Sequence, residues 1–353
     1  MVFTGPGQPL ERCEFDVPAL RADEILVRVM GCTLCGSDLH TFEGRRSVAV
    51  PTVLGHEILG LIVAVGPDAR PLDSTGVSLG VGDRVTWSIV ASCGRCYCCQ
   101  RNLPQKCERM LKYGHEPLQP GDEWTGGLAD YCLLASGTAI VRLPDELPDA
   151  IVCPANCATA TIAAAVEAAG DLTGRRVLVA GAGLLGLTAC AMARSLGASE
   201  VVCLDTNADR LRRAEAFGAT RLVTSNDLAA VVSSATDHRG VDVAFELSGS
   251  PDACESALGS LGLGGRLILV GAVFPTRAVP LLMEQVIRRH LTLTGVHNYA
   301  PPHLHRAVNF LARERQYPFE SLVADWLPLS EANRAFQLAR NPSHLRVGVR
   351  PDE

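Results

Sequence analysis

The stretch "VLVAGAGLLGLTA", residues 177–189, decides the fold of the central part of the chain. It carries Gly181, Gly183 and Gly186 in G-x-G-x-x-G spacing, after a β-branched run and before an apolar helical segment. The first glycine permits a tight turn, the second lets the backbone approach a pyrophosphate, and the third lets the helix pack on the strand. Leu185 lies in the same turn. The stretch predicts a dinucleotide-binding site; the alternative is an ordinary strand-to-helix turn.

A second strand supports the dinucleotide prediction. The run "VVCLDTN" ends at Asp205, nineteen residues after Gly186. A carboxylate at this position accepts hydrogen bonds from the adenosine ribose and repels a 2′-phosphate, which favours NAD over NADP. Arg210 is close enough in the sequence to weaken that preference.

The segments around this stretch predict two domains in a chain of 353 residues. Strand and helix patterns alternate after about residue 158, which indicates a doubly wound parallel sheet with helices on both faces. Residues 1 to about 150 instead contain short β-branched runs bounded by glycine, proline and aspartate turns, so a β-rich domain is expected there. The tail after about residue 297 is mixed and includes the helix-like run "HRAVNFLARER".

Composition narrows the function classes. The chain is 47% hydrophobic and 20% charged with a formal net charge of −6, and it has no basic stripe of the kind that nucleic-acid binders carry. Neither a signal-peptide pattern nor an apolar run long enough to cross a bilayer is present, so a cytoplasmic protein without membrane partners is expected. In a reducing compartment, the fourteen cysteines are better explained as metal ligands or catalytic groups than as disulfides.

Five of these cysteines lie in "CGRCYCCQRNLPQKC", residues 93–107. Four of them follow the spacing C-x2-C-x2-C-x7-C, and four thiolates on one loop can close a tetrahedron around a single Zn²⁺. Such a site has no open coordination position and is structural. An iron–sulfur cluster uses similar ligands and remains an alternative. Cys98 is interpreted as a non-ligand; the predicted ligands are Cys93, Cys96, Cys99 and Cys107.

A second group of chemically active residues lies in "GCTLCGSDLH" and "TVLGHE". A catalytic zinc site takes three protein ligands and leaves one position for substrate. Cys35 and His56 are candidate ligands, and the third is either Cys157, in "ANCATAT", or Cys153. The group as a whole comprises Cys35, Ser37, Asp38, His40, His56 and Glu57.

Three of these residues have predicted roles outside the ligand set. Ser37 and His40 form a path that carries a proton to solvent. Asp38 holds His56 in the tautomer that a metal ligand needs.

Together these motifs resemble the zinc-dependent alcohol dehydrogenases of the medium-chain dehydrogenase/reductase superfamily, over nearly the whole chain. "CGSDLH" is similar to the family's catalytic-zinc and proton-relay motif, and "GHE" and "CATAT" to its further ligand segments. The resemblance implies Cys35, His56 and Cys157 as ligands, Glu57 as a carboxylate that can approach the metal, and Thr161 near the nicotinamide.

The resemblance also implies an architecture. A GroES-like catalytic domain of residues 1–157 and 297–353 would carry the structural zinc lobe at about 93–107. A Rossmann domain would occupy residues 158–296. The chains would assemble as homodimers or homotetramers.

Within the family, segments such as "CTLCGSDLHTFEGRR" and "PANCATATIAAA" resemble a branch associated with phosphonate catabolism. A phosphonate substrate needs cationic partners, because arginine can bind its oxygens bidentately. Candidates near the metal motifs are Arg45, Arg46, Lys112 and His115. The alternative is that these are solvated surface charges.

The leading hypothesis is therefore an enzyme with two zinc ions and NAD that oxidises a small alcohol, with a phosphonate-bearing alcohol as the substrate that the branch resemblance implies. A polyol or threonine-type zinc dehydrogenase is the nearest alternative. A zinc-free quinone or enone reductase lacks the catalytic ligands, so Cys35 and His56 argue against it. A non-catalytic zinc and dinucleotide sensor is disfavoured by the Ser37 and His40 pair.

Overall fold

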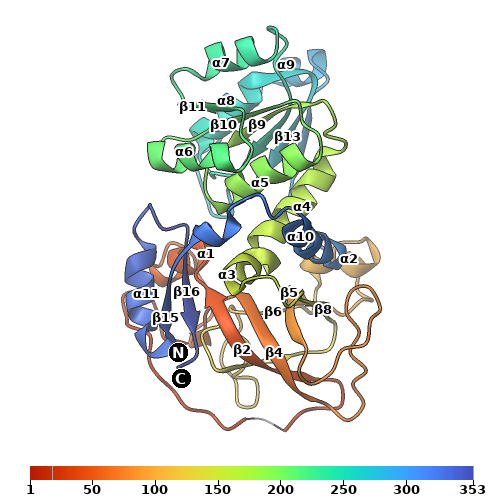
Figure 1. The fold of residues 1–353 in the computed structure, drawn as a ribbon, viewed down its shortest axis with the longest axis vertical. Coiled ribbons are helices and arrows are strands. Elements are labelled where there is room, and N and C mark those ends of the chain that lie inside the picture. Colours follow the sequence, from red (N-terminus) through yellow and green to blue (C-terminus); the bar gives the residue numbers. More distant parts are fainter. Residues whose placement is uncertain (18, 353) are drawn as a thin grey trace. The chain divides into compact units, whose positions relative to one another are not determined.

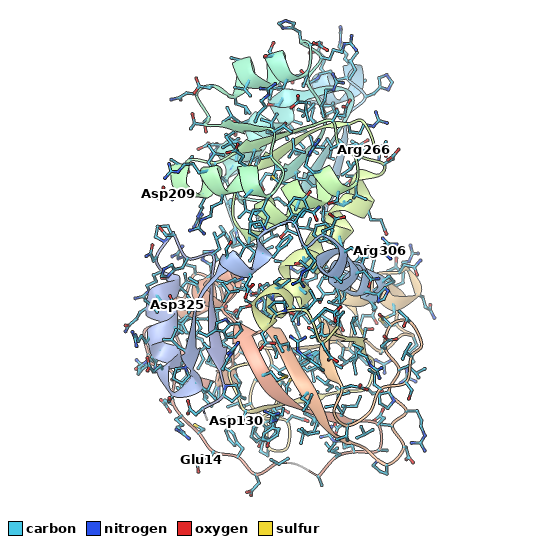
Figure 2. All side chains as sticks on the ribbon, in the orientation of Figure 1. Glu14, Asp130, Asp209, Arg266, Arg306 and Asp325 are labelled. Carbon is cyan, nitrogen blue, oxygen red and sulfur yellow. The ribbon has the colours of Figure 1, made fainter. Side chains whose placement is uncertain are left out.

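The computed structural model describes residues 1–17 and 19–352, and the chain divides into two compact units (Figure 1). Unit 1 comprises Met1–Ala160, Ala300–Arg313 and Phe319–Glu353, while unit 2 comprises Thr161–Tyr299 and Glu314–Pro318. Both chain ends thus contribute to unit 1. Charged side chains such as Asp325 in unit 1 and Asp209 in unit 2 are exposed (Figure 2).

Unit 1 is built on an eight-stranded mixed sheet with the strand order β15-β16-β2-β4-β5-β6; β7 pairs with β2 and β8 with β5. Strands β1 and β3 form a separate antiparallel pair. The strands are β1 Val2–Phe3, β2 Ile25–Thr33, β3 Thr52–Val53, β4 Glu57–Val65, β5 Arg84–Ala91, β6 Leu111–Lys112, β7 Tyr131–Leu134, β8 Thr138–Arg142, β15 Val323–Pro328 and β16 Arg346–Arg350.

Strand β2 organises this sheet. Its first half pairs with β7, its end pairs with β16, and almost its full length pairs with β4. Most of its side chains are buried and Arg28 is exposed, which is why the β-branched run was readable as a strand. The helical segments of unit 1 are α1 Gly36–Phe42, α2 Tyr97–Gln100, η1 Pro104–Lys106, α3 Asp149–Val152, η2 Cys153–Asn156, α10 Pro301–Arg313, η3 Phe319–Leu322, η4 Leu329–Glu331 and α11 Ala332–Ala339.

The core of unit 1 joins residues from distant parts of the chain. Trp87 and Tyr113 are fully buried, as is Phe336 of α11, which stacks on Phe42 at a centroid distance of 4.4 Å. Burial of these large apolar side chains supplies the main driving force that closes the unit around its sheet. The C-terminal strands are therefore part of the same core as the N-terminal ones.

Unit 2 contains a six-stranded sheet with the order β11-β10-β9-β12-β13-β14, all strands parallel. This is the 3-2-1-4-5-6 order of a Rossmann fold, so the predicted doubly wound sheet is confirmed. Because crossovers are right-handed and the order reverses at β9, the connecting helices lie on opposite faces of the sheet. The strands are β9 Arg176–Ala180, β10 Glu200–Leu204, β11 Arg221–Val223, β12 Val241–Glu246, β13 Leu261–Leu269 and β14 Thr292–Gly295.

The helices of unit 2 are α4 Ala158–Ala169 (its first residues counted with unit 1), α5 Leu184–Ser195, α6 Ala208–Ala216, α7 Leu228–Ala235, α8 Pro251–Ser260 and α9 Met283–Arg288. A short piece of the C-terminal tail also packs here: Tyr317 stacks on Phe217 at 6.4 Å. That ring contact explains why Glu314–Pro318 belongs to unit 2, although the expected first domain included it.

In the described part of the chain, no single helix has both the length and the apolar character needed to cross a bilayer. One bent pair, Asp149–Asn156 followed by Ala158–Ala169, passes the test by length and composition alone.

Candidate functional site

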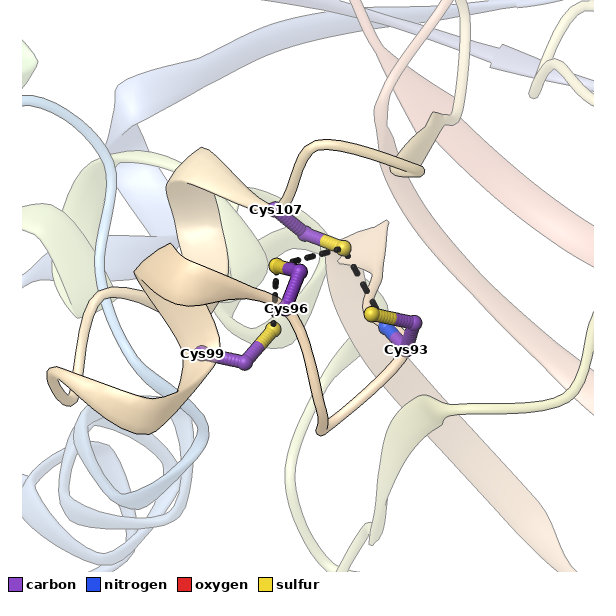
Figure 3. A group of neighbouring side chains, drawn as sticks. All are labelled: Cys93, Cys96, Cys99 and Cys107. Atoms are coloured by element: carbon purple, nitrogen blue, oxygen red, sulfur yellow. Dashed lines mark hydrogen bonds between the residues drawn. The ribbon is translucent and has the colours of Figure 1, made fainter.

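The four-cysteine lobe brings four sulfur atoms together, as Figure 3 shows. Their Sγ atoms all lie within 4.8 Å of one another, with Cys96 3.5 Å from Cys99 and 3.8 Å from Cys107. Helices α2 and η1 turn the loop back on itself, so that cysteines far apart along the loop lie close together. Cys98 is outside this group, and burial raises the pKa of its thiol.

The donor set of the lobe fits one zinc ion. Four thiolates at a Zn–S distance of about 2.3 Å stand about 3.8 Å apart at the corners of a tetrahedron, which matches these separations. An iron–sulfur cluster would hold its sulfurs further apart. The backbone N–H of Arg95 lowers the pKa of Cys93 to about 6, and those of Glu108 and Arg109 donate to Cys96 and Cys107. The loop thus favours the thiolate forms of Cys93 and Cys96. Burial raises the pKa of Cys99 to about 12, so metal binding would have to displace the proton of that thiol.

A second donor group contains Cys35, His56, Glu57 and Cys157, with one ligand atom of each within 4.8 Å of the others. Cys35 follows β2 and is the N-cap of α1, while Glu57 opens β4 directly after His56. The register of β2 and β4 pairs Thr33 with Glu57, which carries the two segments to the same edge of the sheet. Two thiols, an imidazole and a carboxylate are a donor set that suits zinc.

A glycine and an asparagine hold His56 in place. Gly55 has φ +92°, and a Cβ there would lie 2.6 Å from the sulfur of Cys32, so the close turn before His56 requires glycine. Asn156 Nδ2 donates to the carbonyl oxygens of His56 and Trp87 at 3.0 and 2.9 Å. This anchors the end of η2 against β4 and brings the next residue, Cys157, to the donor group.

Cys153 occupies a different position from Cys157. Its thiol is fully buried and donates to the carbonyl oxygen of Glu57 at 3.1 Å, and it is not a member of the donor group. Of the two cysteines that the sequence left open as third ligand, the structure brings Cys157 to the group.

Arg346 closes the buried side of the donor group. From the start of β16 it donates to both carboxylate oxygens of Glu57 at 2.7 Å, and Thr33 Oγ1 donates to Glu57 at 2.6 Å. The same guanidinium lies 3.5 Å from the sulfur of Cys35. Glu57 is 0% exposed and Arg346 6%, so the pair is enclosed by protein. A buried carboxylate needs such a partner, because an unpaired charge there would be very unfavourable.

Asp38 orients the histidine. Its Oδ1 lies 3.1 Å from His56 Nδ1, and its Oδ2 accepts the backbone N–H of Cys35 at 2.9 Å. The carboxylate therefore leaves His56 Nε2 to face the donor group, with Ser37 Oγ 3.4 Å away. His40 lies in the last turn of the same helix, α1, and burial lowers its pKa.

Mutual interactions set the protonation of the group. A hydrogen bond from the Cys157 thiol, assisted by Arg346, holds the pKa of Cys35 well below its usual value and raises that of Cys157. Burial alone would lower the pKa of His56, but Asp38 and Cys35 raise it to about 10. Burial raises the pKa of Glu57 to about 7, although Arg346 opposes this. Zinc binding would displace the protons from its ligands.

The four cationic candidates separate into two kinds. Arg45 has a 61% exposed side chain and pairs with Glu43. Arg46 and Lys112 are partly buried, and His115 places its ring 5.3 Å from that of His56. Arg45 is therefore a surface residue, whereas the other three are partly enclosed and His115 contacts the donor group through His56.

Unit 2 holds the predicted dinucleotide turn between β9 and α5. Gly181 has φ +108°, and a Cβ on Gly186 would lie 1.7 Å from the carbonyl oxygen of Gly181, so neither position accepts a side chain. Gly183 is the N-cap of α5 and has open space in front of it, where a pyrophosphate could approach the helix N-terminus. Leu185 lies half-buried in the first turn of α5.

The predicted ribose-binding residue lies next to this turn. Asp205 follows β10 directly, and its carboxylate accepts the backbone N–H groups of Ala182 at 2.6 Å and Asn207 at 2.7 Å. Arg210 lies one turn further on, in α6. Thr161 lies in α4 and is buried.

Two functional residues could not be identified from the sequence. Arg346 is 289 positions from Glu57 and carries no motif, so nothing local marks it. Asn156 directly precedes Cys157, but only the fold shows that its side chain bonds to His56 and Trp87.

Comparisons with known proteins bear on this geometry. Residues 21–145 match the family "Alcohol dehydrogenase GroES-like domain", and residues 185–313 match "Zinc-binding dehydrogenase". L-threonine 3-dehydrogenase of Deinococcus radiodurans is 32% identical over 83% of this chain and 80% of its own length. These matches confirm the GroES-like assignment of the β-rich unit and zinc as the metal of the family.

Solved structures agree with the sequence relatives. An alcohol dehydrogenase of Thermotoga maritima superposes with a TM-score of 0.93 at 29% identity, covering 100% of this chain and 98% of the other. A zinc-binding dehydrogenase of Sinorhizobium meliloti 1021, solved with NADP, superposes at 0.82 with 25% identity and covers 96% and 94% of the two chains. With two zinc-type donor groups and a Rossmann sheet in one chain, this protein belongs to the zinc-dependent alcohol and threonine dehydrogenases of the medium-chain dehydrogenase/reductase superfamily.

Proposed function

We propose that this enzyme oxidises a small hydroxy compound with NAD as hydride acceptor, using Cys35, His56 and Cys157 as ligands of a catalytic zinc. The observation that carries the proposal is the donor group itself: two sulfurs, an imidazole and a carboxylate meet beside Ser37. Glu57 is assigned as a carboxylate that approaches the metal from its Arg346 ion pair, and the lobe holds a second, structural zinc.

When bound, zinc supplies a Lewis acid that lowers the pKa of a hydroxyl group, and the nicotinamide supplies a hydride acceptor. The side chains of unit 1 handle the remaining proton. Ser37 Oγ accepts it from the substrate hydroxyl and gives up its own hydroxyl proton toward the imidazole of His40, one turn along α1, which releases a proton to solvent. Asp38 keeps His56 Nδ1 engaged, so that Nε2 remains the ligand atom.

Asp205 is assigned as the residue that selects NAD over NADP, and Thr161 is assigned a position near the nicotinamide. A carboxylate that already accepts two backbone N–H groups is fixed in place and repels a 2′-phosphate, which favours NAD; Arg210 works against this. The test compares kcat/KM for NAD and NADP. A preference for NADP would reject the assignment of Asp205.

The defining experiment measures NADH formation by the purified enzyme together with its zinc content. The proposal expects two zinc ions per chain and turnover of small alcohols. Two bound metals and bound NAD without turnover of any alcohol would instead support a non-catalytic zinc and dinucleotide sensor.

Within this reaction class, the proposed substrate is a phosphonate-bearing alcohol. The partly buried cations Arg46 and Lys112 support this proposal. The second candidate is a polyol or threonine-type substrate, favoured by the relatives named L-threonine 3-dehydrogenase. Paired alcohols with and without a phosphonate, assayed beside L-threonine, separate the two.

The remaining assignments concern the whole protein. The catalytic domain is assigned as residues 1–157 with 297–353, and the NAD-binding domain as residues 158–296. The protein is assigned to the cytoplasm, because all fourteen cysteines are free. A dimer or tetramer is supported by β14 at the sheet edge and by Met283 and Ile287 of α9, which are 76% and 72% exposed. Light scattering would test this, and a monomer at micromolar concentration would contradict it.

A further inference from the structure

Lys112 is an unusual cation in this protein. The chain has only two lysines, Lys106 and Lys112, and uses arginine for every other fixed positive charge. Lys106 is exposed on the lobe, whereas Lys112 is half-buried in β6. Among the described residues, the ammonium of Lys112 forms no hydrogen bond or ion pair; Glu116 instead accepts the backbone N–H of Lys112 at 2.6 Å. A partly desolvated charge without a partner costs free energy, and a bound anion would lower that cost.

Arg46 presents a second charge of this kind. It lies on the turn after α1, where its backbone N–H donates to His40, and its guanidinium has no partner among the described residues. Arg46 lies near enough to Lys112 for the two charges to repel, and burial together with Arg46 lowers the pKa of Lys112 to about 8. Two cations that repel each other across a half-buried site are stabilised when an anion binds between them.

The donor group lies beside these two cations. His115 connects Lys112 to the donor group: its backbone N–H donates to the carbonyl oxygen of Lys112 at 3.1 Å, and its ring lies 5.3 Å from that of His56. Lys112 is also close enough to Cys157 and Asp38 to interact electrostatically with both. His115 Nδ1 lies 2.9 Å from the carbonyl oxygen of Tyr113, and burial holds its pKa well below the usual value. The acids nearest to the donor group are already engaged, Asp38 by His56 and Glu57 by Arg346.

We propose that Arg46 and Lys112, with the ring of His115 beside His56, form an oxyanion-binding subsite that selects hydroxy compounds carrying a carboxylate or phosphonate group. This inference rests on the proposed function, since it places the anion of the substrate beside the group that binds its hydroxyl. An amino acid substrate would bring its ammonium toward the same two cations, so the subsite favours hydroxy acids over threonine-like substrates.

The test uses three alcohols of similar size: 2-hydroxyethylphosphonate, 3-hydroxypropanoate and 1-propanol. The readout is the ratio of kcat/KM for each anionic alcohol to that for 1-propanol, in the full-length enzyme with zinc and NAD. Lys112→Met and Arg46→Met should each lower the ratio about 10- to 100-fold, the effect of one charge-assisted hydrogen bond. Lys106→Met and Arg45→Met are the matched controls, which should keep the wild-type ratio.

A binding measurement keeps the inference testable if a variant fails to fold. Because the wild-type chain has only two lysines, reductive methylation with formaldehyde and cyanoborohydride followed by peptide mass spectrometry reports on each of them. Methylphosphonate or acetate should protect Lys112 and leave Lys106 reactive. The anion that protects at the lower concentration identifies the preferred group.

The outcomes separate the two proposals. Turnover of 1-propanol as efficient as that of both anionic alcohols, with Lys112 unprotected, would overturn the subsite and leave the dehydrogenase assignment intact. Protection of Lys112 without turnover of any alcohol would support the subsite and reject the dehydrogenase assignment.

Discussion

The two sulfur-rich groups of this protein reach similar donor spacing by different routes. The lobe collects four thiols from fifteen consecutive residues of an irregular loop (Figure 3). The group at Cys35 collects its donors from the ends of β2 and η2 and the start of β4, and β16 adds Arg346 behind them. Only the second group combines a carboxylate and a guanidinium with its thiols, and the proposed proton path through Ser37 and His40 begins beside it.

The difference follows from what each site must do. A closed site needs only ligands, and a loop with the right spacing provides them with little support from the fold. A site that keeps a position open must hold its ligands rigidly without help from a fourth protein ligand, so it relies on outer contacts such as Asp38 and Asn156. Four variants test this contrast between the two groups.

The largest effect is expected at the open site. Cys35→Ala should lower kcat/KM for alcohol oxidation at least about 10⁴-fold, roughly 5 kcal/mol of transition-state stabilisation, because it removes a proposed ligand of the catalytic zinc. NAD binding, followed by fluorescence titration, should be unchanged, since the cofactor site belongs to unit 2. Turnover within tenfold of wild type would remove Cys35 from the ligand set.

Arg346→Met tests the buried ion pair. Leaving the fully buried carboxylate of Glu57 without its partner should lower the free energy of unfolding by about 3–5 kcal/mol. Chemical denaturation measures this, with Arg334→Met as control. Arg334 pairs with Glu331 on the surface and should change stability by less than about 1 kcal/mol. Equal effects of both variants would contradict the role given to Arg346.

Cys99→Ala tests the lobe. One of two zinc ions should be lost, and the free energy of unfolding should fall by about 2–3 kcal/mol, since metal binding stabilises only the folded loop. Cys98→Ala is the neighbouring control and should keep both metals. An unchanged melting temperature in Cys99→Ala would contradict a structural zinc site in the lobe.

The smallest effect is expected at the orienting carboxylate. Asp38→Asn keeps the size of the side chain but weakens its bond to His56 Nδ1, so activity or zinc affinity should fall about 10- to 100-fold. Asp325→Asn, an exposed control on β15, should match wild type in both measurements. A larger loss than in Cys35→Ala would mean that Asp38 takes part in the reaction directly.

Much of the fold was readable because its signals are local. The alternation of strand and helix between Arg176 and Gly295 and the glycine turn at Gly181 predict the Rossmann sheet from the sequence. The short strands β2, β4 and β5 were likewise indicated by β-branched runs between turn residues. Strand order in unit 1 was not readable, since antiparallel neighbours such as β16 and β2 are joined only by long-range pairing.

The candidate site could be predicted only in part, because only some of its features depend on local sequence. The four-cysteine lobe, the Rossmann turn and the segments of Cys35 and His56 are predictable from the sequence, because each depends on spacing within a few residues. The folded structure was needed to show that Cys157 and not Cys153 joins the donors and that Arg346 pairs with Glu57. It was also needed to show that, within residues 1–17 and 19–352, the side chains of Arg46 and Lys112 have no ion-pair partner while Arg45 has one. These outcomes depend on burial and on contacts between residues about a hundred to three hundred positions apart, which no local pattern encodes.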